Sequence, residues 1–346
     1  LTSAVQFGFI LGTLIFAFLS LADRFSPSKL FFISAVFGAI FNLGIILENN
    51  NLNTLLLLRF LTGFSLAGIY PVGMKLAADY YDKGLGKSLG YLVGALVLGT
   101  AFPHFLKTFT GTENLPWRWV IIATSLFAFL GGLLILLFVP NGPFRKAKGK
   151  FNFSAVFRVF SNKKLRNAAF GYFGHMWELY TFWAFVPIIS AAYKFSIPNS
   201  DFDVSFWSFL IIGIGGVSCV LGGYISEILG VKKTATIALL LSGICCLAFP
   251  FIFLQASTVV LITFLCFWGI VVVADSPLFS TLVASNAPPE IKGTALTIVN
   301  SIGFAITIVS LQLITYLYQI EPVYSLCLLA IGPALGLWGL FTKKRA

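Results

Sequence analysis

Long apolar runs separated by short polar or basic segments dominate the chain. A membrane-spanning helix needs about 20 mostly apolar residues. Runs of this kind occur at 4–22, 30–48, 53–78, 87–106, 118–139, 168–193, 205–228, 234–254, 258–284, 294–318 and 323–341. They are too long, and too continuously apolar, for the alternating strands of a membrane barrel. The pattern therefore predicts an all-α membrane protein that crosses the bilayer eleven times.

The composition excludes a soluble globular protein. Of the 346 residues, 58% are hydrophobic and 10% are charged, whereas a soluble domain carries about 25% charged residues. The net charge of +11 lies in short strips between apolar runs. These strips lack the interleaved aromatic and basic residues of a nucleic-acid platform, so we expect no nucleic-acid partner. The cysteines lie inside apolar runs and are interpreted as small buried side chains: Cys219, Cys245, Cys246, Cys266 and Cys327.

The basic residues are distributed unevenly between the two sides of the predicted membrane. One set of alternating segments, which includes the central connection and the C-terminus, holds 19 of the 23 lysines and arginines. The opposite set holds three, and Arg59 lies within a span. Cytoplasmic segments carry the excess of basic residues. The C-terminus is therefore predicted to be cytoplasmic, and eleven crossings place Leu1 outside.

An internal repeat relates the two halves of the chain. Asp23 and Lys29 follow the first span, and Glu227 and Lys233 follow the seventh at the same offset of 204 residues. This offset carries spans one to five onto spans seven to eleven and leaves 168–193 without a counterpart. Repeats of this size indicate duplicated structural units.

The simplest explanation is a twelve-helix protein whose first helix precedes Leu1 and is missing from this sequence. The predicted domains are an N-terminal lobe of five visible helices (1–139), a basic cytoplasmic linker (140–167) and a C-terminal lobe of six helices (168–346).

The segments after the first and seventh spans share a pattern of glycine, acidic and basic residues. The second copy consists of Gly223, Glu227, Gly230, Lys232 and Lys233. The first copy keeps Asp23, Arg24 and Lys29. Together with an Arg59-x-x-x-Gly63 motif in the third span, these segments resemble the signature of the major facilitator superfamily.

The resemblance covers the whole chain apart from the missing first helix. It implies a two-lobed helical bundle that works by alternating access, with substrate near the membrane midplane. It also implies that the residues of the two loops set the conformational equilibrium without touching substrate. The segments around His175 and Gly293 resemble bacterial members loosely grouped with nitrate and cyanate carriers, which places the protein in a bacterial inner membrane. The span 87–106 lacks the glycine-proline pair typical of many antiporters, which disfavours drug/proton antiport.

Ionisable side chains within spans are candidate functional residues, because each costs at least about 2.5–3.5 kcal/mol in hydrocarbon. Arg59 could donate to an anionic substrate or tune a proton site. The alternatives are a structural ion pair or an approach to the outer headgroups.

The span 168–193 is the richest in polar and aromatic residues. His175 and Glu178 are three residues apart and therefore share a helix face. Histidine titrates near neutral pH, so a histidine–carboxylate pair in a membrane cavity suits proton or substrate binding. Trp177 and Tyr180 lie beside them as further candidate contacts. The alternative is a static polar lock between helices, with the two aromatic residues as packing.

Further candidates lie in the last spans. Asp275 is next to Pro277, which loosens a helix and frees backbone carbonyls. It is a candidate coupling carboxylate or gate hinge, or alternatively a group that caps a helix or pairs with another side chain near the cytoplasmic side. Asn300 and Gln312 in 294–318 are weaker candidate contacts, as is His104 in the earlier span 87–106, since polar residues in membranes often only hold helices together.

These features predict a secondary active transporter of a small polar or anionic solute, with proton-coupled symport favoured. An enzyme is disfavoured, because the two histidines lie in distant spans and no cluster has metal-ligand spacing; no metal or cofactor is expected. A membrane receptor or sensor in a transporter fold, and an antiporter or exporter, remain alternatives. The expected partners are the solute, protons and membrane lipid, and the protein is expected to act as a monomer.

Overall fold

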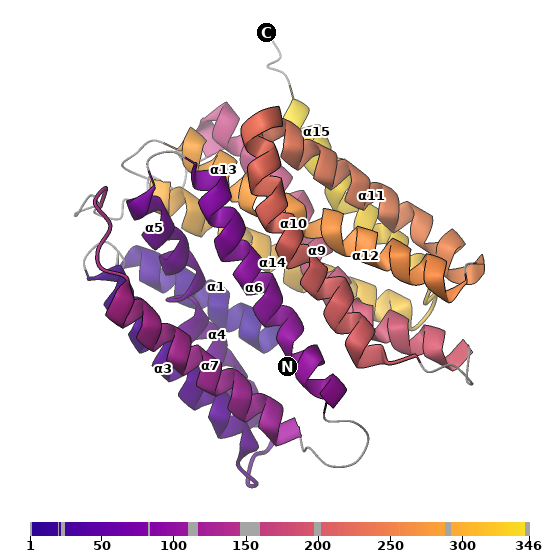
Figure 1. The fold of residues 1–346 in the computed structure, drawn as a ribbon, viewed down its shortest axis with the longest axis horizontal. Coiled ribbons are helices and arrows are strands. Elements are labelled where there is room, and N and C mark those ends of the chain that lie inside the picture. The colour runs from indigo at the N-terminus through magenta and orange to yellow at the C-terminus, as the bar shows by residue number, and fades with distance from the viewer. Residues whose placement is uncertain are drawn as a thin grey trace. The chain divides into compact units, whose positions relative to one another are not determined.

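The computed structural model describes residues 2–19, 21, 25–81, 84–109, 117–145, 160–196, 202–255, 257–287 and 292–342. All regular structure in this part of the chain is helical (Figure 1). Nine of the described helical stretches are long and apolar enough to cross a membrane. The prediction of an all-α membrane protein is confirmed.

The two remaining predicted spans are also helical. The run at 4–22 corresponds to α1 (Thr2–Phe18), whose apolar core Ser3–Phe16 is shorter than the others. The run at 168–193 lies within α9 (Lys163–Ser196), a helix of 34 residues. Its basic first turns and its internal polar residues lower its hydropathy below that of the other long helices.

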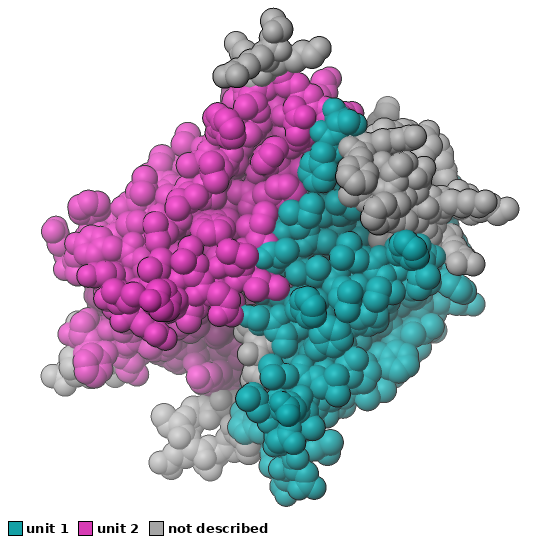
Figure 2. Space-filling model, turned by 180° about the vertical axis from the view of Figure 1, so that it is seen from behind, with its two compact units in different colours: residues 1–85, 112–161, 287–305 teal, residues 86–111, 162–286, 306–346 magenta. Residues whose placement is uncertain are grey.

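Contacts between helices group the chain into two compact units, which Figure 2 colours separately. Unit 1 contains residues 1–85, 112–161 and 287–305. Its helices are α1, α3 (Pro27–Leu43), η1 (Gly44–Ile46), α4 (Leu52–Leu66), α5 (Tyr70–Tyr80) and α7 (Trp117–Phe138), with the first part of α14 (Lys292–Tyr318).

Two glycines allow α1 and α4 to approach closely within unit 1. A Cβ atom on Gly8 would lie 2.0 Å from the carbonyl oxygen of Phe60, and one on Gly63 would lie 1.9 Å from that of Val5. No side chain fits at these separations. Small residues at such crossings are how membrane helices gain packing contacts that lipid cannot replace.

Unit 2 contains residues 86–111, 162–286 and 306–346. Its helices are α6 (Leu85–Phe109), α9, α10 (Val204–Leu229), α11 (Val231–Gln255), α12 (Thr258–Ala274), α13 (Ser276–Asn286), η3 (Tyr324–Ala330) and α15 (Ile331–Phe341), with the second part of α14. This grouping differs in its bounds from the lobes predicted at 1–139 and 168–346, since α6 groups with the later helices. The lobes stay a prediction.

Aromatic residues fill the centre of unit 2. The ring centroids of Phe182 on α9 and Trp268 on α12 are 4.5 Å apart, and Phe249 on α11 lies 5.9 Å from the same indole. All three side chains are fully buried. The core of this unit is therefore built where α9, α11 and α12 meet, and the polar candidates of α9 lie within it.

Candidate functional site

His175 and Asp275 form a buried pair inside unit 2. His175 Nδ1 lies 2.8 Å from Asp275 Oδ1, and the two side chains are 1% and 0% exposed. The sequence suggested that His175 and Glu178 share a face of α9, and both are indeed buried, but the carboxylate that meets the histidine is Asp275. This contact links α9 to the end of α12.

A break between α12 and α13 positions Asp275. The first helix ends at Ala274, Asp275 is its C-cap residue, and the second helix starts at Ser276. Pro277 has no backbone N–H and cannot continue the hydrogen-bond ladder of α12. The backbone N–H of Phe279 bonds to the Asp275 carbonyl at 2.8 Å, which starts the new helix. The interruption expected beside Pro277 is thus present.

Glu178 is surrounded by hydrogen-bond donors from two other helices. The Trp268 indole Nε1–H donates to Oε1 at 2.7 Å, and the Cys246 thiol donates to the same oxygen at 3.3 Å. The Ser242 hydroxyl donates to Oε2 at 2.9 Å. The Glu178 side chain is 1% exposed. The three donors satisfy a carboxylate that is sealed from solvent, as buried polar groups require.

Sequence reasoning missed these three donors. Ser242 and Cys246 are four residues apart and so present one face of α11 to Glu178. That spacing is a weak signal, because small polar residues at this interval are common in membrane helices. Trp268 lies 90 positions beyond Glu178 in the chain, and nothing in the sequence connects the two.

The His175–Asp275 pair has unused hydrogen-bonding capacity. Among the described residues, His175 Nε2 and Asp275 Oδ2 have no hydrogen-bond partner, and neither has the buried hydroxyl of Ser280 on α13. Leaving a buried polar atom unpaired costs roughly 1–3 kcal/mol. Such atoms mark a place where a proton, a water molecule or a small polar ligand gains bonds on entering.

Trp177 and Tyr180 are placed as helix contacts. The Trp177 indole donates to the Leu328 carbonyl of η3 at 3.2 Å. The Tyr180 ring packs edge-on against Trp183, with centroids 5.2 Å apart. Both are half-buried. Their substrate roles stay predictions, and the observed contacts are those of the packing alternative.

Arg59 and Asn300 belong to unit 1, apart from this cluster in the contact grouping. The Arg59 guanidinium is half-buried and donates to Asn42 Oδ1 at 3.3 Å. Asn42 in turn donates to Ser125 Oγ on α7 at 2.9 Å. The Asn300 side chain is buried, and its amide nitrogen has no partner among the described residues. No carboxylate of the described part of the chain pairs with Arg59.

The loop residues are only partly described. Asp23 and Arg24 lie outside the described residues, as does the linker segment 146–159. Glu227, Lys29 and Lys233 are exposed.

The second loop has one defined backbone conformation and two defined contacts. Gly230 ends α10 with φ +87°, a conformation that favours glycine. A Cβ on Gly223 would lie 3.0 Å from the Lys87 Cα of α6, so this position also needs glycine. Lys232 donates to the Leu340 carbonyl at the end of α15, at 2.9 Å. These contacts fit a loop that fixes helix ends.

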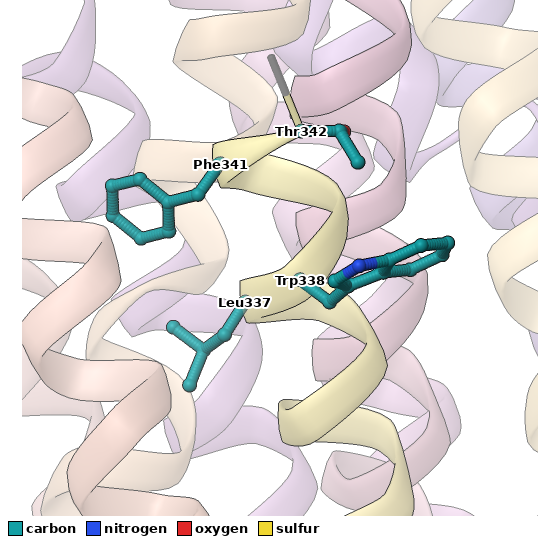
Figure 3. Close-up of a pocket in the computed structure, with 4 residues that line it drawn as sticks. All are labelled: Leu337, Trp338, Phe341 and Thr342. Carbon is teal, nitrogen blue, oxygen red and sulfur yellow. The ribbon is translucent and has the colours of Figure 1, made fainter. Parts of the chain in front are cut away.

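A surface hollow lies elsewhere in the described structure. Leu337, Trp338, Phe341 and Thr342 line it, all from α15 and the residue that follows (Figure 3). The buried cluster of His175 and Glu178 is packed and closed by comparison.

Family comparison decides the class of protein. The model of the Major Facilitator Superfamily matches residues 1–311. This chain belongs to the major facilitator superfamily. The membership agrees with the membrane-spanning helices of the described residues, and transport of a small solute stays a proposal for this chain. The nitrate and cyanate subfamily, the missing first helix and the bacterial inner membrane stay predictions.

Curated relatives of this superfamily member are fungal. The "MFS-type transporter acdC" of Aspergillus candidus is 33% identical over 142 residues, which are 40% of this chain and 27% of that protein. The "Efflux pump FUB11" of Gibberella fujikuroi is 31% identical over 135 residues, 39% of this chain and 23% of that protein. The chain thus matches about a quarter of the length of these relatives.

Solved superfamily structures share the fold. The human organic anion transporter MFSD10 matches with a TM-score of 0.75 and 16% identity, covering 98% of this chain and 82% of that one. The proton:xylose symporter XylE gives 0.75 and 15%, covering 97% and 83%. The E. coli fucose:proton symporter gives 0.70 and 13%, covering 98% and 88%. At these identities the likeness concerns the fold alone.

Proposed function

We propose that this chain is a proton-coupled secondary transporter of a small polar or anionic solute, and that His175, Asp275 and Glu178 handle the proton. The observation that carries the proposal is the 2.8 Å contact between His175 and Asp275, both fully buried at a helix break. Ionisable groups inside a membrane bundle are rare and costly, and are retained for ion or substrate pathways.

The chemistry of the pair suits proton exchange. Histidine changes charge near neutral pH, and burial favours the neutral form of a carboxyl group. The pair therefore offers two groups that can each hold a proton. The unpaired Nε2 and Oδ2 atoms offer positions through which the proton enters and leaves.

The solute site is proposed to include Arg59. Its guanidinium presents a fork of donors that matches carboxylate and phosphate groups. Asn42 occupies one of these donors at 3.3 Å, and no carboxylate among the described residues neutralises the charge. An anionic solute would supply the missing countercharge.

The test is transport by purified protein in proteoliposomes, with and without an imposed pH gradient, over a panel of small organic anions and amino compounds. The expected result is accumulation that follows the gradient. Asp275→Asn and Glu178→Gln should abolish gradient-driven accumulation and retain solute exchange. Asp203→Asn is the matched control, because Asp203 caps α10 outside the cluster and asparagine caps equally well. Full accumulation by both cluster variants, or its loss in the control, contradicts the proposal.

Export by proton antiport is the second candidate. It is favoured by the fungal relatives, of which one is named an efflux pump and another belongs to the ascochitine biosynthesis cluster. A pH-sensitive dye inside the vesicles separates the two functions without an imposed gradient. Solute entry that acidifies the lumen indicates symport, and entry that makes it alkaline indicates antiport.

A further inference from the structure

The end of α15 carries a shallow hollow lined mainly by apolar side chains. Leu337 and Phe341 point to one side of the helix and Trp338 and Thr342 to the other, so the four residues form two pairs at i,i+4 spacing that border the hollow (Figure 3). Trp338 is 69% exposed and Phe341 is 58% exposed. We call the surface lined by these four residues the α15 furrow. In a membrane protein such an apolar surface faces acyl chains.

Positive charge is fixed at one end of the furrow. Lys232, in the first turn of α11, places its ammonium 4.8 Å from the centre of the Phe341 ring. The same ammonium donates to the Leu340 carbonyl at 2.9 Å. A lysine ammonium has three donors, so two remain available. Lys233 is exposed beside it.

The surrounding sequence adds basic residues and no acid. Residues 231–255 and 322–346 contain no aspartate or glutamate. Lys343, Lys344 and Arg345, which lie outside the described residues, follow the furrow directly in the chain. Glu227, the nearest acid in sequence, interacts electrostatically with Lys87 of α6. No carboxylate of the described ranges forms an ion pair with Lys232 or Lys233.

The start of α9 meets the same place. Asn167 donates to the Leu340 carbonyl at 3.4 Å, so the first turns of α9 adjoin the end of α15. These turns carry Lys163 and Lys164, which sequence bias assigns to the cytoplasmic side. Among the described residues, lysines of α9 and α11 therefore lie in the turns that adjoin the carboxyl end of α15.

We infer that the α15 furrow binds an anionic phospholipid, with its headgroup at Lys232 and Lys233 and one acyl chain between the two pairs of side chains. Clusters of lysine and arginine at the cytoplasmic end of a membrane helix attract anionic headgroups, an effect worth about fivefold in affinity for each residue. The exposed Trp338 ring suits the boundary between headgroup and chain. A free phosphate ion would use the lysines but not the furrow.

Tryptophan quenching by brominated lipids tests this site. The purified protein is placed in neutral detergent micelles and titrated with phosphatidylglycerol or phosphatidylcholine carrying dibrominated chains. The chain has seven tryptophans, so the Trp338 signal is the difference between the wild type and Trp338→Phe. We expect Trp338 to be quenched at an about 25-fold lower mole fraction of phosphatidylglycerol than of phosphatidylcholine, about fivefold for each of the two lysines.

Charge variants identify the headgroup site. Lys232→Gln with Lys233→Gln should raise the phosphatidylglycerol midpoint about 25-fold, to that of phosphatidylcholine. The matched control is Lys29→Gln with Lys194→Gln, which removes the same charge at two exposed positions elsewhere and should leave the midpoint unchanged. Thermal midpoints in detergent establish that all variants are folded.

Three outcomes overturn the inference. Equal quenching by the two lipids indicates ordinary boundary lipid without headgroup selection. A matching loss of preference in the control pair indicates a response to net charge alone. Competition by millimolar inorganic phosphate indicates a site for a free anion. None of these outcomes bears on proton coupling, so the proposed function is tested separately.

Discussion

The bond between Trp268 and Glu178 gives the sharpest test of the buried cluster. Trp268→Phe removes the Nε1–H that donates to Glu178 Oε1 at 2.7 Å. It keeps an aromatic ring against Phe182, whose centroid lies 4.5 Å from that of the indole. The substitution therefore deletes one of three donors to a fully buried carboxyl group and retains most of the packing.

The expected free-energy change depends on the charge of Glu178. A hydrogen bond to a charged group contributes about 1.5–3 kcal/mol, and a bond between neutral groups contributes about 0.5–1.5 kcal/mol. The smaller ring also leaves a space, which adds a packing cost to the single variant. A double-mutant cycle with Glu178→Met removes that packing cost, because it appears in both arms of the cycle.

The assay is reversible unfolding in mixed micelles, with dodecyl sulfate as denaturant, at mildly acidic and mildly alkaline pH. We expect a coupling free energy of about 1.5–3 kcal/mol at alkaline pH, where the carboxylate is charged. Protonation converts the bond to the neutral kind, so the coupling should fall as the pH is lowered.

Two results refute this reasoning. A coupling free energy below about 0.5 kcal/mol at both pH values, less than a neutral bond contributes, means that the indole does not donate to Glu178 in the folded protein. A large coupling that is the same at both pH values means that Glu178 keeps one charge state, as a static lock between α9, α11 and α12. The second result would also remove Glu178 from the proposed proton pathway.

Two further predictions concern unit 1. Gly63→Ala should destabilise the protein by about 1–3 kcal/mol, because its Cβ would lie 1.9 Å from the Val5 carbonyl oxygen. The control is Gly131→Ala on α7, whose Cβ would meet nothing within 4 Å. Equal thermal midpoints in detergent for the two variants would contradict the close crossing of α1 and α4. Arg59→Lys keeps the charge and loses the planar fork of donors. Because it removes one charge-assisted hydrogen bond, it should raise the KM for an anionic solute roughly tenfold or more, with little change in the thermal midpoint of the protein. A wild-type KM would contradict the role of Arg59 in binding an anion.

The fold could be predicted because the bilayer imposes a simple rule on the sequence. Each span must be long and apolar, so helix positions follow from hydropathy alone. The rule is weakest for α9, where His175, Glu178 and the basic first turns reduce the hydropathy. That span was still recognisable from its aromatic and aliphatic residues. Proline alone did not predict the helix interruptions, because α12 ends just before Pro277 whereas Pro103, Pro187 and Pro250 lie inside continuous helices.

The contacts of the candidate site could not be predicted from the sequence. Glu178 is bonded by side chains 64, 68 and 90 positions away, and no periodic pattern records which helices are neighbours. Spacing on one helix indicated that His175 and Glu178 share a face, and both are buried as a result. It could not indicate that Asp275 would take the histidine, because that depends on the register between α9 and α12.

That register gives the cluster a mechanical consequence. His175 meets Asp275, and Glu178, one turn further along α9, meets Trp268, about two turns earlier on α12. The two helices therefore run antiparallel at this contact. Glu178 accepts its hydrogen bond from Trp268 within the continuous part of α12, whereas His175 contacts Asp275 at the end of that helix.

A proton that changes the His175–Asp275 contact thus acts at the residue where α12 ends and α13 begins. The α12–α13 break is proposed as the element that converts protonation into movement, and Glu178 as the anchor against which it moves. If so, restoring a continuous helix with Pro277→Ala should uncouple transport from the pH gradient while the His175–Asp275 pair remains intact. Gradient-driven accumulation at the wild-type level in Pro277→Ala would show that the α12–α13 break does not link protonation of the His175–Asp275 pair to transport.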